Sequence, residues 1–255
     1  MNIYSWNVRG LNIDPTRRTC MAQVLASYPS RNVLIALQET KLREFSHDYL
    51  IKKFVASYHY GVSSAQGTCG GVLTLVSRDW QVLSSSSDFV GKWVLLCLHK
   101  LGSTFSVLNL YASSLVSDRI EFWSNLPPIF DYRLIVLGDF TIYIDPSDGP
   151  HTISFSECVA WLLFQSSHSL VDACHILQHF PHQTCTNCCL GPFFCSVRLD
   201  HFYLSSSGSW LRLSFAKTHR FTTLSDHSLV MLRCRFQELP PYTFFSPFVM
   251  NSLLK

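Results

Sequence analysis

The stretch Val136-Leu137-Gly138-Asp139-Phe140 ends an apolar, strand-like run with an acidic side chain. An acidic or amide residue within such a run is costly unless it is paired or binds a metal, so the ends of strands are the informative places. The same pattern recurs at four further points, which are Asn7, Glu39, Asp200 and the pair Asp226-His227. Carboxylates at the ends of several strands of one sheet converge on one edge, where they can hold a hard divalent cation through oxygen ligands. We therefore expect one polar site at a sheet edge.

The composition indicates a protein with a large buried core. The chain has 255 residues, of which 47% are apolar and only 15% are charged, against roughly 25% charged in an average soluble protein. Mean hydropathy is +0.17, yet no apolar run reaches the roughly 18 residues that a membrane-spanning helix needs. These values argue against a disordered chain and against a membrane protein.

The N-terminus and the cysteines bear on the compartment. Residues 1–6 carry neither a basic segment nor an apolar signal core, so we expect a nuclear or cytoplasmic protein that is not secreted. The ten cysteines are then interpreted as reduced thiols rather than a disulfide framework. The net charge is +3 and the basic residues are scattered, so a nucleic-acid function must be argued from the site. No obligate protein partner is evident.

Apolar runs of strand length alternate with stretches of helical spacing, which predicts a mixed α/β fold. The expected strands are Asn2–Val8, Val33–Leu37, Gly71–Ser77, Trp93–His99, Phe105–Tyr111, Leu134–Leu137, Leu199–Leu204 and Ser228–Phe236. The expected helices are Thr16–Tyr28, Ser117–Leu126 with Ser117 as cap, and Ser154–Phe164, in which Ser154 and Glu157 have capping-box spacing.

The serine-rich runs and the C-terminal segment set the predicted domain organisation. Ser84–Ser87 and Ser205–Ser209 are interpreted as hairpin or loop tips, and no linker or repeat divides the chain. We therefore expect one domain over residues 1–238. From Pro240 onward the periodicity is lost, and residues 239–255 are interpreted as a tail.

Nine motifs occur in order and at plausible spacing along the chain. They are WNVRGLN from Trp6, LQETK from Leu37, GGVLTLV from Gly70, LNLYASS from Leu108, Arg119 with Trp123, LGDF from Leu137, LVDA from Leu170, VRLDHFYLS from Val197 and SDHS from Ser225. Each motif is weak alone, but in this order they make the chain resemble the endonuclease/exonuclease/phosphatase superfamily, and most closely the endonuclease domain of plant LINE-type (non-LTR) retrotransposons.

The resemblance implies a four-layered α/β sandwich, with two facing mixed β-sheets flanked by helices and one site at their edge. Glu39 would be the principal ligand of Mg²⁺, with Mn²⁺ as a substitute, helped by Asn7, while Asp226 would complete the acidic edge. The metal would neutralise charge on the scissile phosphate and the leaving oxygen of DNA. The tail resembles the segment that joins this domain to a reverse transcriptase in such elements, and would be a remnant of that linker.

The resemblance also implies roles for the catalytic side chains. Asp139 would orient and deprotonate the attacking water. His227, held by Asp200, would present a polarised or charged imidazole to a phosphate oxygen, and Tyr111 would donate its hydroxyl to the phosphate. In-line attack would then leave a 5′-phosphate and a 3′-hydroxyl, which a retroelement uses as a primer.

One departure from the superfamily pattern falls inside the site. Where the family has Gly-Asp-Phe-Asn, this chain has Gly138-Asp139-Phe140-Thr141. Thr141 replaces an amide that donates to the phosphate, and its hydroxyl is shorter. Loss of one preorganised donor typically costs about 10² to 10³ in rate, so we expect a weakened or inactive site.

A second departure lies in the run from His179 to Cys195. Its spacing, His179-x2-His182-x2-Cys185-x2-Cys188, contains metal-ligand residue types. A structural zinc site usually needs two separated ligand pairs, and a second pair about a dozen residues away is absent from this run. Sequence drift in a loop is therefore the favoured interpretation.

Three alternatives to a retroelement-type DNA endonuclease are open. One is a catalytically dead remnant of such a domain, which Thr141 and the low charge would favour. Another is an abasic-site DNA repair endonuclease, which shares several of the motifs. The third is a small-molecule phosphatase, because a fold does not fix a function.

Overall fold

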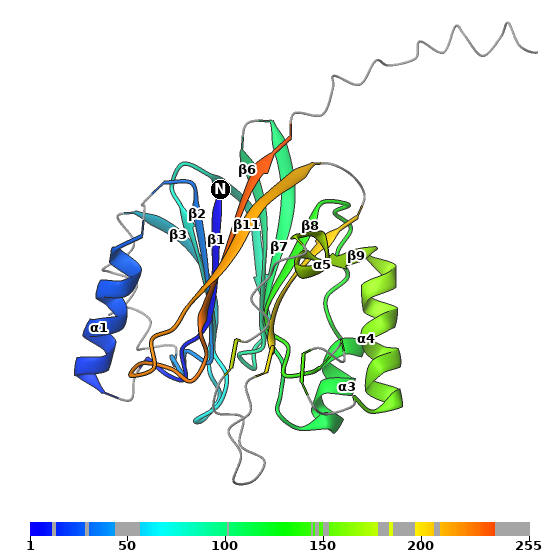
Figure 1. The fold of residues 1–255 in the computed structure, drawn as a ribbon, viewed down its shortest axis with the longest axis horizontal. Coiled ribbons are helices and arrows are strands. Elements are labelled where there is room, and N and C mark those ends of the chain that lie inside the picture. Colours follow the sequence, from blue (N-terminus) through cyan, green and yellow to red (C-terminus); the bar gives the residue numbers. More distant parts are fainter. Residues whose placement is uncertain are drawn as a thin grey trace, which may run out of the picture.

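Two six-stranded β-sheets face each other in the computed structural model of this protein (Figure 1). The structure describes residues 1–11, 14–28, 31–43, 57–100, 102–143, 145, 148–149, 153–177, 184–185, 197–206 and 210–237. The predicted tail, 239–255, and the domain boundary before it lie outside these residues.

The first sheet has the strand order β11-β12-β1-β2-β4-β3. Its strand β1 is parallel to β2 and antiparallel to β12. In chain order the bounds are β1 Asn2–Asn7, β2 Val33–Gln38, β3 Tyr58–Ser63, β4 Val72–Ser77, β11 Leu211–His219 and β12 Leu229–Phe236. Consequently β1 and β2 end, and β12 begins, at the same edge of this sheet.

The second sheet has the strand order β5-β6-β7-β8-β10-β9. Its strand β8 is parallel to β7 and antiparallel to β10. The bounds are β5 Gln81–Ser87, β6 Trp93–Lys100, β7 Ser103–Tyr111, β8 Leu134–Asp139, β9 Leu170–Asp172 and β10 Asp200–Ser205. Here β7 and β8 end, and β10 begins, at one edge.

Helices cover the outer faces of the two sheets, as Figure 1 shows. Their bounds are α1 Pro15–Ala26, α3 Val116–Ser124, α4 Phe155–Ser167 and α5 Ala173–Leu177. Met21 and Leu25 of α1 pack in one cluster with the outward side chains of β1 and β2. Trp123 of α3 and Trp161 of α4 do the same on the second sheet. The predicted α/β sandwich with helical outer layers is confirmed.

The layer between the sheets holds a continuous apolar core. Ile3, Ala36 and Val72 from the first sheet pack with Val107 and Leu137 from the second, and all are 0% exposed. Alternate residues of β1 point the other way, toward α1, because side chains alternate along a strand. The two sheets are thereby fixed face to face, which brings their polar edges together.

The predicted strands are confirmed with end shifts of at most two residues, and the predicted helices lie close to α1, α3 and α4. Ser154 caps α4 as expected, since its side chain accepts a hydrogen bond from Glu157 N at 3.4 Å. The cap at Ser117 is wrong: the N-cap of α3 is Leu115, which makes no side-chain cap bond. The loop tip at Ser84–Ser87 is also wrong, because these residues pair with β6 as part of β5.

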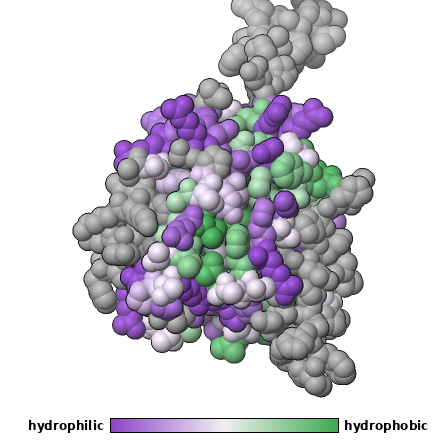
Figure 2. Space-filling model, turned by 60° about the vertical axis from the view of Figure 1, so that its left-hand side comes forward, coloured by the Kyte–Doolittle hydropathy of each residue, from purple (hydrophilic) through white to green (hydrophobic). Residues whose placement is uncertain are grey.

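Two surface properties complete the description. Within the described residues, no helix is both long and apolar enough to cross a membrane. With the left-hand side of Figure 1 turned forward, hydrophilic residues gather at the top of the surface, and hydrophobic residues are exposed near its centre and toward the upper right (Figure 2).

Gly138, just before the acidic end of β8, has a backbone that only glycine accommodates. Its φ is +137°, and a Cβ placed on it would lie 2.0 Å from the backbone oxygen of Leu110 in the neighbouring strand β7. The close parallel approach of β7 and β8 therefore requires glycine here.

We predict that Gly138→Ala lowers the free energy of unfolding by about 2–4 kcal/mol, the combined cost of a disfavoured φ and an overpacked contact. Urea unfolding measures this value. Gly102→Ala is the matched control, because Gly102 also has a positive φ of +74° but nothing within 4 Å of its added Cβ. An equal loss in both variants would show that the contact with Leu110 does not matter.

Candidate active site

An asparagine joins the two sheets at their polar edges. Asn7, at the end of β1, is 0% exposed. Its Nδ2 donates to Asp139 Oδ2 of the second sheet at 2.7 Å and to Glu39 Oε1 at 3.2 Å. Its Oδ1 accepts from the backbone nitrogen of Arg9 at 3.0 Å, which fixes the amide orientation. Two carboxylates from facing sheets are thus held together by one amide group.

Glu39 follows β2 in a tight left-handed backbone segment and has two basic neighbours. The φ angles of Glu39, Lys41 and Arg9 are +48°, +54° and +51°. Arg9 Nη1 lies 3.5 Å from Glu39 Oε1, and Lys41 Nζ lies 3.7 Å from Glu39 Oε2. Glu39 is 6% exposed, so these groups partly compensate a nearly buried charge.

A histidine lies between two further carboxylates. His227 Nδ1 is 2.9 Å from Asp200 Oδ2, and His227 Nε2 is 3.9 Å from Asp139 Oδ2. The three residues come from the start of β10, the end of β8 and the segment before β12, and each is buried. The contacts therefore continue from Glu39 through Asn7 and Asp139 to His227 and Asp200.

This arrangement raises the pKa of both Asp139 and His227. Burial raises the pKa of Asp139 to about 6, with Asp200 and Glu39 adding to the rise and His227 and Asn7 opposing it. Burial alone would lower the pKa of His227, but the Asp200 and Asp139 carboxylates outweigh it and raise the pKa well above 6.5. At neutral pH the imidazole is therefore charged, and Asp139 titrates close to that pH.

Thr141 lies beside Asp139 with its hydroxyl turned inward. Its backbone nitrogen donates to Asp139 Oδ1 at 2.9 Å. Its Oγ1 is 3.1 Å from both the Ala112 carbonyl oxygen and Asp139 Oδ1. Its φ is +52°, an outlier for a β-branched residue. Thr141 braces Asp139 but its hydroxyl is engaged within the protein.

Tyr111, at the end of β7, adjoins Glu39. Burial raises the pKa of its hydroxyl, as do the charges of Glu39 and Asp139 and a hydrogen bond with Glu39. Lys92 Nζ lies 4.6 Å from the centre of the Tyr111 ring. The hydroxyl is therefore protonated at neutral pH, and it donates this proton to the Glu39 carboxylate.

All eight residues proposed from the sequence lie at this one end of the sandwich. Asp226 is linked to the others through Arg9, whose Nη2 lies 2.8 Å from Asp226 Oδ2. The structure adds Arg9, Lys41 and Lys92, which sequence reasoning did not single out. Arg9 and Lys41 each stand two residues after a candidate, Asn7 and Glu39, and that spacing was the available signal.

Other residues in the resembling motifs have structural contacts. Arg119 of α3 forms an ion pair with Glu157 of α4 and donates to the Ser113 and Ser114 carbonyl oxygens at 3.0 and 2.9 Å. The ring of Trp123 stacks on Phe140, with centroids 5.7 Å apart. These two residues hold α3 against α4 and the second sheet.

The cysteine-rich run from His179 to Cys195 lies largely outside the described residues. Within it, Cys185 is buried and forms isolated β-bridges with Val197 and His227. Cys185 therefore lies beside the site, and its side chain forms a hydrogen bond with His227 that helps to raise the pKa of the imidazole.

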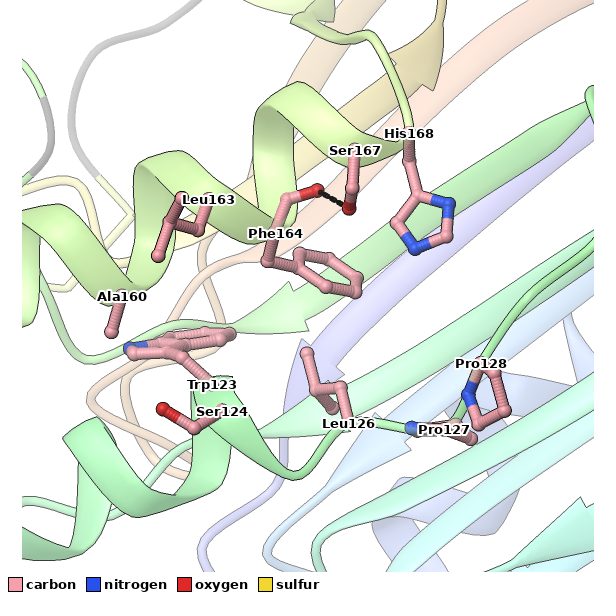
Figure 3. A pocket seen from close by; sticks show the side chains of 10 residues that line it. All are labelled: Trp123, Ser124, Leu126, Pro127, Pro128, Ala160, Leu163, Phe164, Ser167 and His168. Carbon is pink, nitrogen blue, oxygen red and sulfur yellow. Dashed lines mark hydrogen bonds between the residues drawn. The ribbon is translucent and has the colours of Figure 1, made fainter.

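A separate pocket of about 360 Å³ lies between α3 and α4 (Figure 3). Apolar side chains such as Trp123, Leu126 and Phe164 line it. It contains none of the candidate residues, so the polar edge and not this pocket is the candidate active site.

Comparison by sequence finds a transposon protein. The chain is 29% identical over 199 residues to the transposon TX1 uncharacterized 149 kDa protein of Xenopus laevis. The match covers 74% of this chain and 15% of that protein, so the chain spans a small part of its relative. No family model matches the chain.

Comparison by structure finds nuclease-type folds over almost the whole chain. The catalytic domain of Xenopus laevis APE2 has a TM-score of 0.66 at 19% identity, covering 94% of each chain. An endonuclease/exonuclease/phosphatase family protein of Leptotrichia buccalis has a TM-score of 0.63 at 15% identity, covering 92% and 100%. The endonuclease domain of TRAS1, a telomere-specific non-LTR retrotransposon, has a TM-score of 0.64 at 12% identity, covering 93% and 99%.

The two facing sheets, the outer helices and the buried carboxylates at one end of the sheets therefore define an α/β sandwich with a polar site. The chain has the fold of the endonuclease/exonuclease/phosphatase superfamily, which confirms the resemblance drawn from the motifs. A transposon protein is among the proteins that match its sequence, and the endonuclease domain of a non-LTR retrotransposon is among its structural neighbours.

We predict that Asp200→Asn lowers the pKa of His227 from its raised value in the parent protein, because burial then acts with less opposition. NMR titration of the imidazole measures this shift. A His227 titration identical to the parent's would contradict the assigned pair.

The loss of stability in Asp200→Asn should depend on pH. A histidine whose pKa is raised on folding contributes stability that is complete below its unfolded pKa and is lost as pH rises through the folded pKa. The loss in Asp200→Asn, about 3 kcal/mol, should therefore be greatest at pH 5–6 and shrink at alkaline pH.

Proposed function

We propose that this chain is a divalent-metal-dependent phosphodiesterase that nicks DNA, of the type carried by LINE-like retroelements. One observation carries the proposal: Asn7 joins the Glu39 and Asp139 carboxylates, and Asp139 faces a His227–Asp200 pair. This set contains an oxygen ligand for a cation, a base and a charged hydrogen-bond donor. The transposon relative and the TRAS1 endonuclease domain support the retroelement assignment.

The residues fit Mg²⁺, with Mn²⁺ as a substitute. Burial and the neighbouring carboxylates disfavour ionised Asp139, and Asp200 Oδ1 is buried without a hydrogen-bond partner. Within the described part of the chain, no three His, Cys, Asp or Glu side chains form a ready-made metal cluster. Mg²⁺ needs no such cluster, because it usually keeps several waters and takes one or two carboxylates plus substrate phosphate oxygens.

Glu39 would be the principal ligand, with Asn7 and Asp226 at the same acidic edge. When bound, the metal supplies Lewis-acid neutralisation of the scissile phosphate and the leaving oxygen. Asn7 orients Glu39 and Asp139 with respect to each other, so that the ligand and the base act on the same phosphodiester.

Asp139 is the proposed general base. A base is most effective when its pKa lies near the working pH, and burial raises the pKa of Asp139 to about 6. The backbone nitrogen of Thr141 donates to its Oδ1 and Asn7 donates to its Oδ2. Both contacts hold the carboxylate in place while it takes a proton from the attacking water.

His227 and Tyr111 are the proposed phosphate contacts. Asp200 keeps the His227 imidazole charged, so its Nε2–H can donate to a non-bridging phosphate oxygen. Tyr111 retains its proton and would donate likewise when its hydroxyl exchanges Glu39 for the phosphate. Water attacks phosphorus in line, the bond from phosphorus to the 3′ oxygen breaks, and the products are a 5′-phosphate and a 3′-hydroxyl.

Plasmid nicking tests the proposal. We expect purified parent protein to convert supercoiled plasmid to open circles in Mg²⁺ or Mn²⁺ but not in EDTA. Glu39→Gln, which keeps the side-chain shape, should lose at least about 100-fold in rate, the size of a lost charge-stabilising contact. Equal nicking by Glu39→Gln would reject the site, and no nicking by a folded parent would identify a dead remnant.

We predict that Thr141→Asn raises nicking at least tenfold, because an amide can reach the phosphate where the threonine hydroxyl is turned inward. It should also raise the free energy of unfolding by about 1 kcal/mol, since asparagine tolerates the left-handed φ at this position better than threonine. Thr141→Ser serves as the control and should give no gain in rate. A Thr141→Asn variant with unchanged activity would mean that another feature limits the site.

A further inference from the structure

The turn that joins β5 to β6, residues 88–92, lies at the same end of the sandwich as the candidate active site. In the second sheet, β5 ends and β6 begins where β7 ends at Tyr111 and β8 ends at Asp139. Tyr111 N donates to the Lys92 carbonyl oxygen at 2.7 Å. The turn is therefore in direct contact with a residue that adjoins Glu39.

Side-chain and backbone hydrogen bonds hold this turn in a fixed shape. The Asp88 carboxylate accepts from the backbone nitrogens of Lys92 and Trp93 at 3.0 and 3.3 Å, and from the Ser63 hydroxyl. Ser63 Oγ in turn accepts from Gly91 N at 3.0 Å. The turn is thus tied to its own strands and to β3 of the other sheet.

The backbone packs tightly around Gly91, with no room for a side chain at this position. Its φ is +75°, and an added Cβ would lie 2.5 Å from Gly71 N. Gln66 Nε2 donates to the Phe89 carbonyl oxygen at 2.9 Å, so the residue at the tip of the turn is itself anchored. A rigid support of this kind lowers the entropy lost when its side chain binds a ligand.

The side chain at the tip of this turn projects into solvent. Phe89 is 91% exposed and Val90 is 46% exposed. Exposure alone does not distinguish Phe89, since Phe130 is 94% exposed and single exposed apolar residues are common. Phe130, however, precedes β8 and lies at the opposite end of the second sheet from Asp139. Position and rigid anchoring set Phe89 apart.

Cationic groups lie at the same end of the sandwich as this turn. Lys92 ends the turn and packs on Tyr111, and Lys41 and Arg9 lie next to Glu39. Cations that follow a phosphate backbone, combined with an aromatic ring on which a base can stack, are how proteins bind single strands. The faces of bases within a duplex are covered by their neighbours, whereas an unpaired base offers a free face.

We propose that Phe89 stacks on an unpaired nucleobase next to the phosphate held at the site. This inference rests on the proposed function, and it adds a preference for DNA with unpaired bases beside the scissile bond.

The test is equilibrium binding in EDTA, so that no cleavage contributes. Fluorescence anisotropy compares a single-stranded oligonucleotide with a fully paired duplex for the parent, Phe89→Ala, Phe89→Trp and the matched control Phe130→Ala. We expect Phe89→Ala to weaken single-strand binding about tenfold or more, with little change for the duplex. Phe89→Trp should bind like the parent, and Phe130→Ala should be unchanged.

A second readout separates stacking from charge. Stacking neutralises no phosphate, so Phe89→Ala should leave the dependence of log affinity on log salt concentration unaltered, whereas Lys92→Gln should reduce its slope. Single-strand binding by Phe89→Ala equal to the parent's, or an equal loss in Phe130→Ala, would overturn the stacking assignment. A folded parent that binds no DNA would instead overturn the proposed function.

Discussion

The buried amide of Asn7 is the contact on which the site depends. It donates to Glu39 from the first sheet and to Asp139 from the second, at 3.2 and 2.7 Å, and its own oxygen is fixed by Arg9 N. Without this amide, two nearly buried carboxylates would face each other across the gap between the sheets, where like charges repel strongly. The apolar core sets the distance between the sheets. At that distance Asn7 reaches both acids and holds their carboxylates in one arrangement.

The pKa values of the site residues follow from their burial and from the number of carboxylates that surround the one imidazole. Three buried carboxylates, those of Glu39, Asp139 and Asp200, lie around one buried imidazole, while the carboxylate of Asp226 is partly exposed. Burial raises the pKa of Asp139 to about 6, while Asp200 keeps His227 charged. Asp139 therefore has a pKa near neutral pH and lies beside the charged His227, which can donate a hydrogen bond. This combination suits a step in which a water molecule loses its proton while negative charge develops on a phosphate. The same arrangement leaves the folded state sensitive to the loss of either partner in the His227–Asp200 pair.

Much of this arrangement is visible in the sequence, because strand ends are where polar residues interrupt apolar runs. The central strands and the residues at their ends could be predicted for that reason. Edge strands such as β5 could not, since Ser84–Ser87 pair through their backbones while their side chains face solvent and show no alternation. The sequence also does not reveal that Arg9 and Lys41 contact Glu39. These contacts depend on backbone segments with positive φ, which leave no periodic pattern in the sequence. The inward hydroxyl of Thr141 likewise required the structure, although the substitution itself was evident.

We propose that Asp139, held by Asn7 and facing His227, activates water for attack on a phosphodiester. The most direct test is the chemistry of the ends at a nick made in Mg²⁺ by the parent protein and by Asp139→Asn. Extension by a DNA polymerase detects a 3′-hydroxyl, and resealing by a ligase without prior treatment also requires the adjoining 5′-phosphate. We expect nicks that are both extendable and ligatable from the parent and at least about 100-fold fewer from the variant, the scale of a lost catalytic proton transfer. Nicks with blocked 3′ ends, or equal nicking by a correctly folded Asp139→Asn, would contradict it.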